Sequence, residues 1–307
     1  MNENIAIEVK NLSKVYKGQN KYALDNVSFK IKSGIIFGLL GPNGAGKSTF
    51  INILADLVHK SSGSINVLGH NHEKELITVK SKMGIVPQEL NIDPFFTPFE
   101  LLEIQAGLYG VHKKNRNTMK ILNMLSLQDK SHSYARTLSG GMRRRLLIGK
   151  AMVHNPDILI LDEPTAGVDV GLRKTLWKNI EELKNQGKTI IITTHYLHEA
   201  EELCDEIAII NNGKLVAIDK TSNIKSLIDN KKIIIKHNSE NKINLTELKK
   251  LNIEISIKPY KITIDYKPKE IDSNYLLTCL TEANIKIEDI LIQDSNLEEV
   301  FLKLVKN

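Results

Sequence analysis

The stretch GPNGAGKS, residues 41–48, decides how the rest of the chain is interpreted. It fits the pattern G-x-x-x-x-G-K-[ST], and it lies between the apolar run Ile35–Leu40 and a segment, Thr49–Leu57, that we expect to be helical. Glycines let such a loop curl until its backbone N–H groups point inward, and the helix adds the positive end of its dipole. Lys47 would place a charge on the phosphates, and the Ser48 hydroxyl would ligate Mg²⁺. The loop therefore predicts a nucleotide phosphate site rather than a glycine turn that binds nothing.

Apolar runs recur through the first 220 residues. The continuous runs Ile158–Leu161 and Ile190–Thr193 predict strands buried on both faces, as in a parallel sheet covered by helices. Further strands are expected at Ile5–Val9, Val27–Ile31, Ile35–Leu40 and Ile207–Ile210. The segment Pro98–Ser126 predicts helices inserted between two halves of this α/β core.

Two acids, Asp162 and Glu163, follow the strand Ile158–Leu161. At the carboxyl edge of a parallel sheet, beside the phosphate loop, Asp162 can hold the Mg²⁺ shell. Neighbouring strand residues point to opposite faces, so Glu163 can act separately as general base for a water aimed at the γ-phosphate. Without a phosphate loop upstream, such a pair would be a solvated loop or a helix cap. His195 ends the strand Thr189–Thr194, where a lone histidine is more often structural.

The run Leu138-Ser139-Gly140-Gly141-Met142 resembles the LSGGQ signature of ABC ATPases, with Met142 replacing the usual Gln. The resemblance extends over residues 5–220. Tyr16 then corresponds to the aromatic residue that stacks on adenine, Gln88 to the Q-loop, Asp169 to the D-loop and His195 to the switch histidine. It implies catalytic roles for Glu163, His195, Lys47 and Gln88, metal ligation by Ser48, Gln88 and Asp162, and ATP binding by Tyr16, Gly41, Pro42, Asn43, Gly44, Ala45, Gly46, Lys47, Ser48, Thr49, Gln88 and Asp162.

The family's architecture implies a P-loop NTPase cassette in residues 1–222, with a RecA-like core, an antiparallel β subdomain and a helical subdomain at about residues 95–155. Its cofactors would be ATP and Mg²⁺. In ABC proteins the signature faces the phosphate loop of a second copy, so Leu138, Ser139, Gly140, Gly141 and Met142 would act in trans in a homodimer that sandwiches two ATP molecules. The phrases LSGGMRRR and LEEVFLKL resemble daunorubicin-resistance-type ATPases of the ABC-2 branch. That branch implies a separate membrane permease and export of a small or amphipathic molecule such as a drug, antibiotic, lipid or glycan.

The amino-acid composition restricts the cellular location and the partners that we expect. No apolar run approaches the ~20 residues that cross a bilayer, and the N-terminus does not resemble a secretion signal, so we expect a cytoplasmic protein held on the cytoplasmic face of the membrane by its permease. The net charge of +6 comes from scattered lysines, without a basic helix, so no nucleic-acid partner is expected. Cys204 and Cys279 are expected to be reduced packing residues. Two other functions stay open: a nucleotide-dependent regulatory ATPase of a membrane complex, and a soluble ABC protein acting on the ribosome or DNA.

The pattern changes after Ser222. Short strands and helices in the order β-α-β-β-α-β-α predict a small α+β domain at residues 223–307, suited to a ferredoxin-like sandwich. The closing helix has apolar residues at Leu297, Val300, Phe301 and Leu304. Its lysine-rich strands would face anionic lipid, pair with the other protomer's tail, or be solvated. We expect a dimer-stabilising or regulatory role.

Overall fold

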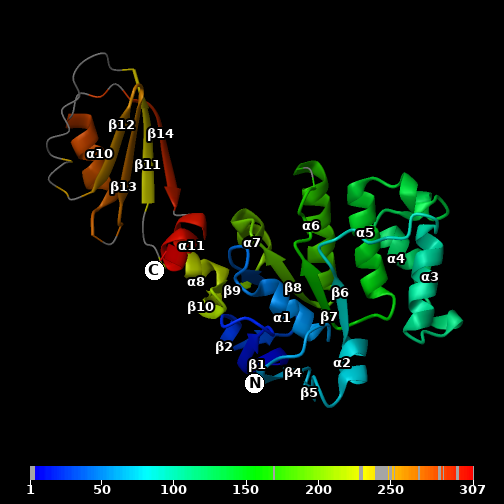
Figure 1. Ribbon diagram of the computed structural model, residues 1–307. Helices are drawn as coiled ribbons and strands as arrows, with labels where there is room; N and C mark the ends of the chain where they lie inside the picture. The colour runs from blue at the N-terminus through cyan, green and yellow to red at the C-terminus, as the bar shows by residue number, and fades with distance from the viewer. Residues whose placement is uncertain are drawn as a thin grey trace. The chain divides into compact units, whose positions relative to one another are not determined.

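The computed structural model describes residues 4–168, 170–227, 231–238, 248, 251, 253–268, 270–282, 285, 287–294 and 297–306. The chain divides into two compact units, Met1–Thr221 and Ser222–Asn307, each with its own sheet or sheets (Figure 1). Among the described helices, none combines the length and the apolar character needed to span a bilayer.

A six-stranded sheet forms the centre of the first unit. Its order is β10-β9-β3-β8-β7-β6, and all neighbours from β9 to β6 run parallel. Both faces are covered, since every residue of β3 and β8 is buried, which confirms the prediction from the continuous apolar runs. Parallel strands end at one edge of the sheet, so the segments after β3, β7 and β8 meet there. The bounds are β3 Ile36–Leu40, β6 Met83–Val86, β7 Ile158–Asp162, β8 Thr189–Thr194, β9 Glu206–Asn211 and β10 Lys214–Lys220.

An antiparallel sheet of order β2-β1-β4-β5 packs against this core. Phe29 of β2 stacks on Phe37 of β3 with ring centroids 5.8 Å apart, which joins the two sheets. Strand β1 continues past Val9, its expected end. Asn11 has φ 48° and the register to β2 shifts there, so a bulge interrupts the alternation of apolar and polar residues from which a strand is predicted. The bounds are β1 Ile5–Val15, β2 Tyr22–Lys32, β4 Ser62–Val67 and β5 His70–Asn71.

Three helices, α3 (Pro98–Leu108), α4 (Thr118–Met124) and α5 (Gly140–Met152), pack on one another beside β6 (Figure 1). Helix α3 starts at a capping box formed by Thr97 and Glu100. Short 3₁₀ turns occur at Lys113–Asn115, Gln128–Lys130 and Ala135–Thr137. The remaining helices of this unit are α1 Lys47–Leu54, α2 Leu76–Lys82, α6 Val170–Asn185 and α7 Leu197–Leu203.

The second unit is an antiparallel sheet of order β12-β13-β11-β14. Leu276 and Leu280 of helix α10 pack on its isoleucines, among them Ile233 and Ile264. The first helix of the predicted order β-α-β-β-α-β-α, expected at residues 246–251, lies outside the described residues except for positions 248 and 251. Helix α8 (Thr221–Ser226) spans the boundary in sequence. The other bounds are β11 Lys231–His237, β12 Glu254–Lys258, β13 Lys261–Tyr266, α10 Ser273–Glu282, β14 Ile287–Asp294 and α11 Leu297–Lys306.

Candidate active site

The loop of residues 41–48 joins β3 to α1 at the carboxyl edge of the parallel sheet. Two of its glycines are required by close backbone approaches. A Cβ on Gly41 would lie 2.3 Å from the carbonyl oxygen of Ile210, and one on Gly46 would lie 2.5 Å from that of Ala23. Gly46 also has φ 115°, a left-handed conformation that suits glycine. The backbone of the loop therefore packs closely against the Ile210 and Ala23 carbonyl groups. The first N–H groups of α1 have no partner within the helix and are suited to binding an anion.

A cavity of about 390 Å³, the cassette cavity, opens over this loop. It brings the loop together with three predicted site residues that lie far along the chain, Gln88, Glu163 and His195. Its full lining is Ala23, Asn43, Gly44, Ala45, Gly46, Lys47, Ser48, Thr49, Gln88, Glu163 and His195.

Lys47 is 6% exposed and turns its ammonium group onto the loop itself. Nζ donates to the carbonyl oxygen of Gly41 at 2.7 Å and to that of Pro42 at 3.1 Å. Burial lowers the pKa of Lys47, while the charges of Glu163 and Asp162 raise it. The lysine is therefore a buried cation whose best additional partner would be an anion in the cassette cavity.

Glu163 has a partner at each of its carboxylate oxygens. Its Oε2 accepts from Nε2 of Gln88 at 3.0 Å, and its Oε1 lies 2.9 Å from Nδ1 of His195. The backbone is fixed as well, since its N–H lies within hydrogen-bond distance of both the carbonyl and the hydroxyl oxygen of Thr193. With φ 47°, Glu163 adopts a left-handed conformation that is costly for a residue with a side chain and is typical of functional sites.

Asp162 ends β7 beside Glu163, and the Thr193 hydroxyl donates to its Oδ1. Burial raises the pKa of the Asp162 carboxyl, and Glu163 adds to this effect. The hydrogen bond from Thr193 and the charges of Lys47 and Arg144 lower it. Thr193 therefore contacts both acids, a role that its position in an apolar strand hides in the sequence. A hydroxyl at the carboxyl end of a buried strand was the available signal.

Tyr16 does not line the cassette cavity but lies next to it. Its hydroxyl is 3.3 Å from the hydroxyl of Thr49, and the Lys14 ammonium lies 5.0 Å from the centre of its ring. The ring therefore lies beside the end of the phosphate loop, where it could contact a ligand that extends beyond the loop.

The signature does not line the cassette cavity of its own chain. Ser139 caps α5, its hydroxyl accepting from the Met142 N–H at 3.3 Å. Leu138 is buried, whereas Ser139 and Gly140 are exposed. A Cβ on Gly140 would meet no atom within 4 Å, so packing within the chain does not require glycine there. The predicted D-loop residue Asp169 lies outside the described residues.

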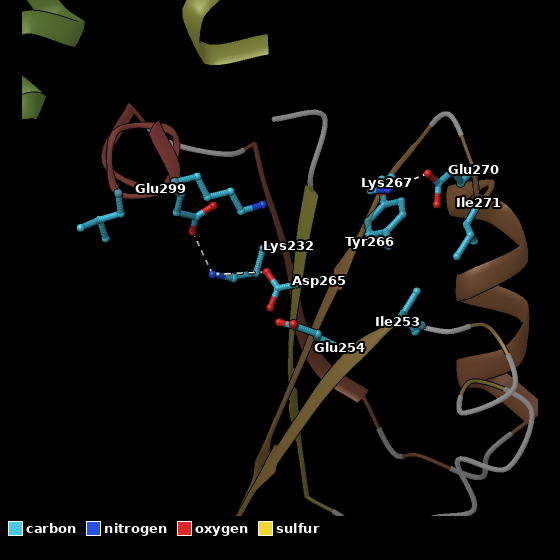
Figure 2. Close-up of a pocket in the computed structure, with 11 residues that line it drawn as sticks. Lys232, Ile253, Glu254, Asp265, Tyr266, Lys267, Glu270, Ile271 and Glu299 are labelled. Atoms are coloured by element: carbon cyan, nitrogen blue, oxygen red, sulfur yellow. Dashed lines mark hydrogen bonds and ion pairs between the residues drawn. The ribbon is translucent and has the colours of Figure 1, made fainter. Parts of the chain in front are cut away.

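A second, larger cavity of about 500 Å³, the accessory cavity, lies in the second unit (Figure 2). Lys232 lies 3.3 Å from Asp265 and 3.1 Å from Glu299, and Lys267 lies 2.7 Å from Glu270. Two of its three lysines thus neutralise acids of the same cavity. The full lining is Lys232, Ile253, Glu254, Asp265, Tyr266, Lys267, Glu270, Ile271, Glu299, Leu302 and Lys303.

Known proteins resemble this chain in sequence and in structure. Residues 24–166 match the family described as ABC transporter. The linearmycin resistance ATP-binding protein LnrL of Bacillus subtilis (strain 168) is 35% identical over 305 residues, covering 97% of each chain. The daunorubicin/doxorubicin resistance ATP-binding protein DrrA of Streptomyces peucetius is 32% identical over 97% of this chain and 92% of its own. A dimeric ATP-binding cassette solved in a post-hydrolysis state with ADP and Pi superimposes with a TM-score of 0.62 at 26% identity, over 70% of this chain and 98% of that one.

Proposed function

The chain belongs to the family of ABC transporter ATP-binding proteins and is an ATP-hydrolysing subunit of an exporter, and we propose which of its residues perform the hydrolysis. Lys47 and the backbone of loop 41–48 hold the phosphates of ATP, and Glu163 accepts a proton from the attacking water. Gln88 and His195 orient Glu163. The observation that carries this proposal is the Glu163 carboxylate, which contacts Gln88 through one oxygen and His195 through the other beside the phosphate loop.

The chemistry needs a fixed base and a stabilised leaving group. A water oxygen attacks the γ-phosphorus, the bond from that phosphorus to the β,γ-bridging oxygen breaks, and the water's proton passes to Glu163. When His195 carries its proton on Nδ1, it donates to Oε1 of Glu163 and fixes the direction of the carboxylate. Charge that develops on the leaving ADP is stabilised by Lys47 and by the N–H groups at the start of α1.

The residues at the edge of the loop fit Mg²⁺ by their chemistry. Ser48, Asp162 and Gln88 offer a hydroxyl, a carboxylate and an amide oxygen, and Mg²⁺ prefers oxygen ligands. Gln88 donates its amide nitrogen to Glu163, so its amide oxygen would be the atom that it offers to the ion. When bound, the ion would neutralise charge on the β- and γ-phosphates.

We assign the signature to the ATP of a second copy of this chain. Ser139 and Gly140 are exposed and lie outside the cassette cavity, although a helix start with a hydroxyl is suited to a phosphate. In a head-to-tail homodimer, the signature of each copy would cover the cassette cavity of the other. Hydrolysis in that arrangement needs both copies.

The permease is proposed to dock on the segment between β6 and α3 and on α3 itself. Large apolar side chains are exposed there, and exposed apolar surface of this kind marks a protein partner. They are Leu90, Phe95, Phe96, Ile104 and Leu108. Because Gln88 begins the same segment, a permease bound there would act directly on a contact of Glu163. We propose that the subunit bound in this way lies at the cytoplasmic face of the membrane.

The cargo is proposed from the two relatives that match over nearly the whole chain. One is named for resistance to linearmycin and the other for resistance to daunorubicin and doxorubicin. We infer export of a small or amphipathic molecule, such as a drug, antibiotic, lipid or glycan. Residues 223–307, which make up nearly all of the second unit, are proposed to stabilise or regulate the dimer.

The substitution Glu163→Gln tests the hydrolytic assignment. We expect ATP binding to be retained and turnover to fall by about 10²–10⁴, the usual contribution of a general base. The same variant, tagged and extracted from membranes in mild detergent with ATP and Mg²⁺, should bring down an integral membrane protein identified by mass spectrometry. Normal turnover would refute the role of Glu163. Recovery of only ribosomal or DNA-bound proteins would refute the permease partner and leave the ATPase chemistry standing.

A further inference from the structure

Helix α5 carries three consecutive arginines that point in different directions. Nε of Arg143 donates to the carbonyl oxygen of Leu138 at 3.0 Å, at the start of the same helix. Nη1 of Arg145 donates to the carbonyl oxygen of Leu125 at 2.6 Å, at the end of α4. Nη1 of Arg144 instead donates at 3.0 Å to the carbonyl oxygen of Pro87, in the segment that follows β6. Of the three, Arg144 therefore links the signature helix to the parallel sheet.

Arg144 is buried close to the two acids of the active site. It is 3% exposed, and its Nε has no hydrogen-bond partner within the described part of the chain. Burial lowers the pKa of Arg144, whereas the negative charges of Asp162 and Glu163 raise it. A guanidinium remains charged in proteins. The buried charge is therefore balanced by the acids that bind metal and activate water, and by one carbonyl group.

The carbonyl group that Arg144 holds belongs to the residue before Gln88. The Pro87 carbonyl and the Gln88 N–H belong to one planar peptide group, so a displacement of the carbonyl also displaces the start of Gln88. Gln88 in turn donates to Glu163 at 3.0 Å. On the other side, Ser139 caps the same helix five residues before Arg144, about 7.5 Å along the axis at 1.5 Å per residue. One continuous set of contacts thus runs from the signature to the proposed general base of the same chain.

We propose that Arg144 is a positioning residue that transmits the position of the signature helix to Gln88 and Glu163 of its own chain. Since the signature is assigned to the ATP of the second copy, closure over that ATP would set the general base of the first copy. Arg144 would thereby couple the two ATP sites of the dimer. This inference rests on the proposed roles of Glu163 and Ser139.

The test compares Arg144→Gln with Arg145→Gln in the full-length chain. Arg145 is also a buried arginine of α5 that donates to backbone carbonyls, but its acceptors, Leu125 and Ser126, lie just after α4 rather than after β6. Binding of a fluorescent ATP analogue gives the nucleotide Kd, and steady-state hydrolysis gives kcat and the Hill coefficient. For Arg144→Gln we expect Kd to change by less than about threefold and kcat to fall about 10- to 100-fold, the scale of a misplaced catalytic group. The Hill coefficient should fall from above 1 to about 1.

Arg145→Gln is expected to lower Tm while kcat and the Hill coefficient of the folded protein stay within about twofold of wild type. Equal losses in both variants would overturn the proposal, because a loosened helix would then explain them. Wild-type kcat and cooperativity in Arg144→Gln, or a wild-type Hill coefficient of 1, would overturn it too.

A conservative variant keeps the test decisive if Arg144→Gln does not fold. Arg144→Lys retains the charge but replaces a rigid fork by a single flexible donor. We expect kcat to fall about three- to tenfold at unchanged Kd. Unchanged kcat and Hill coefficient in Arg144→Lys would overturn the coupling. Turnover lost in Glu163→Gln but normal in Arg144→Gln would refute this inference alone, whereas normal turnover in Glu163→Gln would refute the general base itself.

Discussion

The cassette cavity and the accessory cavity differ in what their charged side chains contact. In the accessory cavity, Lys232 and Lys267 neutralise acids of the same wall. In the cassette cavity, Lys47 donates to two carbonyl groups of its own loop and forms no ion pair within the part of the chain that the structure describes, and it is more deeply buried than Lys232. A buried cation held by carbonyl groups alone gains much from an arriving phosphate, whereas a paired lysine gains little.

This difference shows that volume does not identify the functional cavity. The accessory cavity is the larger, at about 500 Å³ against about 390 Å³. The cassette cavity is distinguished by close-packed glycines, by the left-handed backbone of Glu163, and by residues that converge from five separate segments. Strain and convergence of this kind accumulate where a ligand is held.

The largest expected effect comes from replacing the lysine of each cavity, Lys47 or Lys232, with alanine. Lys47→Ala should weaken ATP binding by about 2–5 kcal/mol, or roughly thirty- to several-thousandfold, because a buried phosphate charge loses its partner. Lys232→Ala is the matched control and should leave the nucleotide Kd unchanged. Isothermal titration of both variants with ATP measures the difference. Equal affinities would mean that the cassette cavity is not the phosphate site.

A smaller effect is expected from removing residues 223–307. The cassette cavity lies wholly within the first unit, so the nucleotide Kd of the truncated chain should equal that of the full chain. Dimerisation in ATP should weaken by about tenfold or more if the second unit adds an interface of its own. Sedimentation at several protein concentrations measures it. ATPase activity and dimerisation that are both unchanged would remove the second unit from any role in the dimer.

The smallest effect concerns the ion pairs of the accessory cavity. The hydrogen bond with Glu299, chiefly, and the charge of Asp265 raise the pKa of Lys232. A raised pKa means that the folded state favours the charged lysine, so its stabilisation is present below the ordinary value of 10.5 and is lost as pH rises through the folded pKa. Lys232→Gln should therefore cost about 1 kcal/mol or less near pH 8. Calorimetry should show the two proteins converging as pH rises above 10.5. A difference that persists there would assign the effect to packing.

Much of the cassette could be predicted because its chemistry depends on residue types at fixed spacings. Each group of site residues lies at the end of a buried strand: the loop of residues 41–48 after β3, the two acids at the end of β7, and His195 after β8. Parallel strands end at one edge of the sheet, so these groups meet there. The ends of elements were less predictable. Strand β1 runs to Val15 rather than ending at Val9, because a bulge at Asn11 interrupts the alternation that would reveal the longer strand.

Arg144 shows what the sequence could not reveal. A run of three arginines on a helix normally indicates a solvated face, yet here the middle side chain is buried near Asp162 and Glu163. Its burial depends on how α5 packs beside β6, and nothing in the local sequence records that contact. The pairing of Lys232 with Glu299 is hidden for the same reason, since 67 residues separate them.

The open space beside Gly140 has a consequence for how this position evolves. Its missing Cβ would touch nothing in the isolated chain, so a methyl group there would escape any screen that scores folding or solubility. If the second copy's ATP occupies that space, natural selection detects the substitution only in the assembled pair. A survey of tolerated mutations in the single chain would then classify Gly140 as free to vary, although the assembled dimer would tolerate no larger residue there.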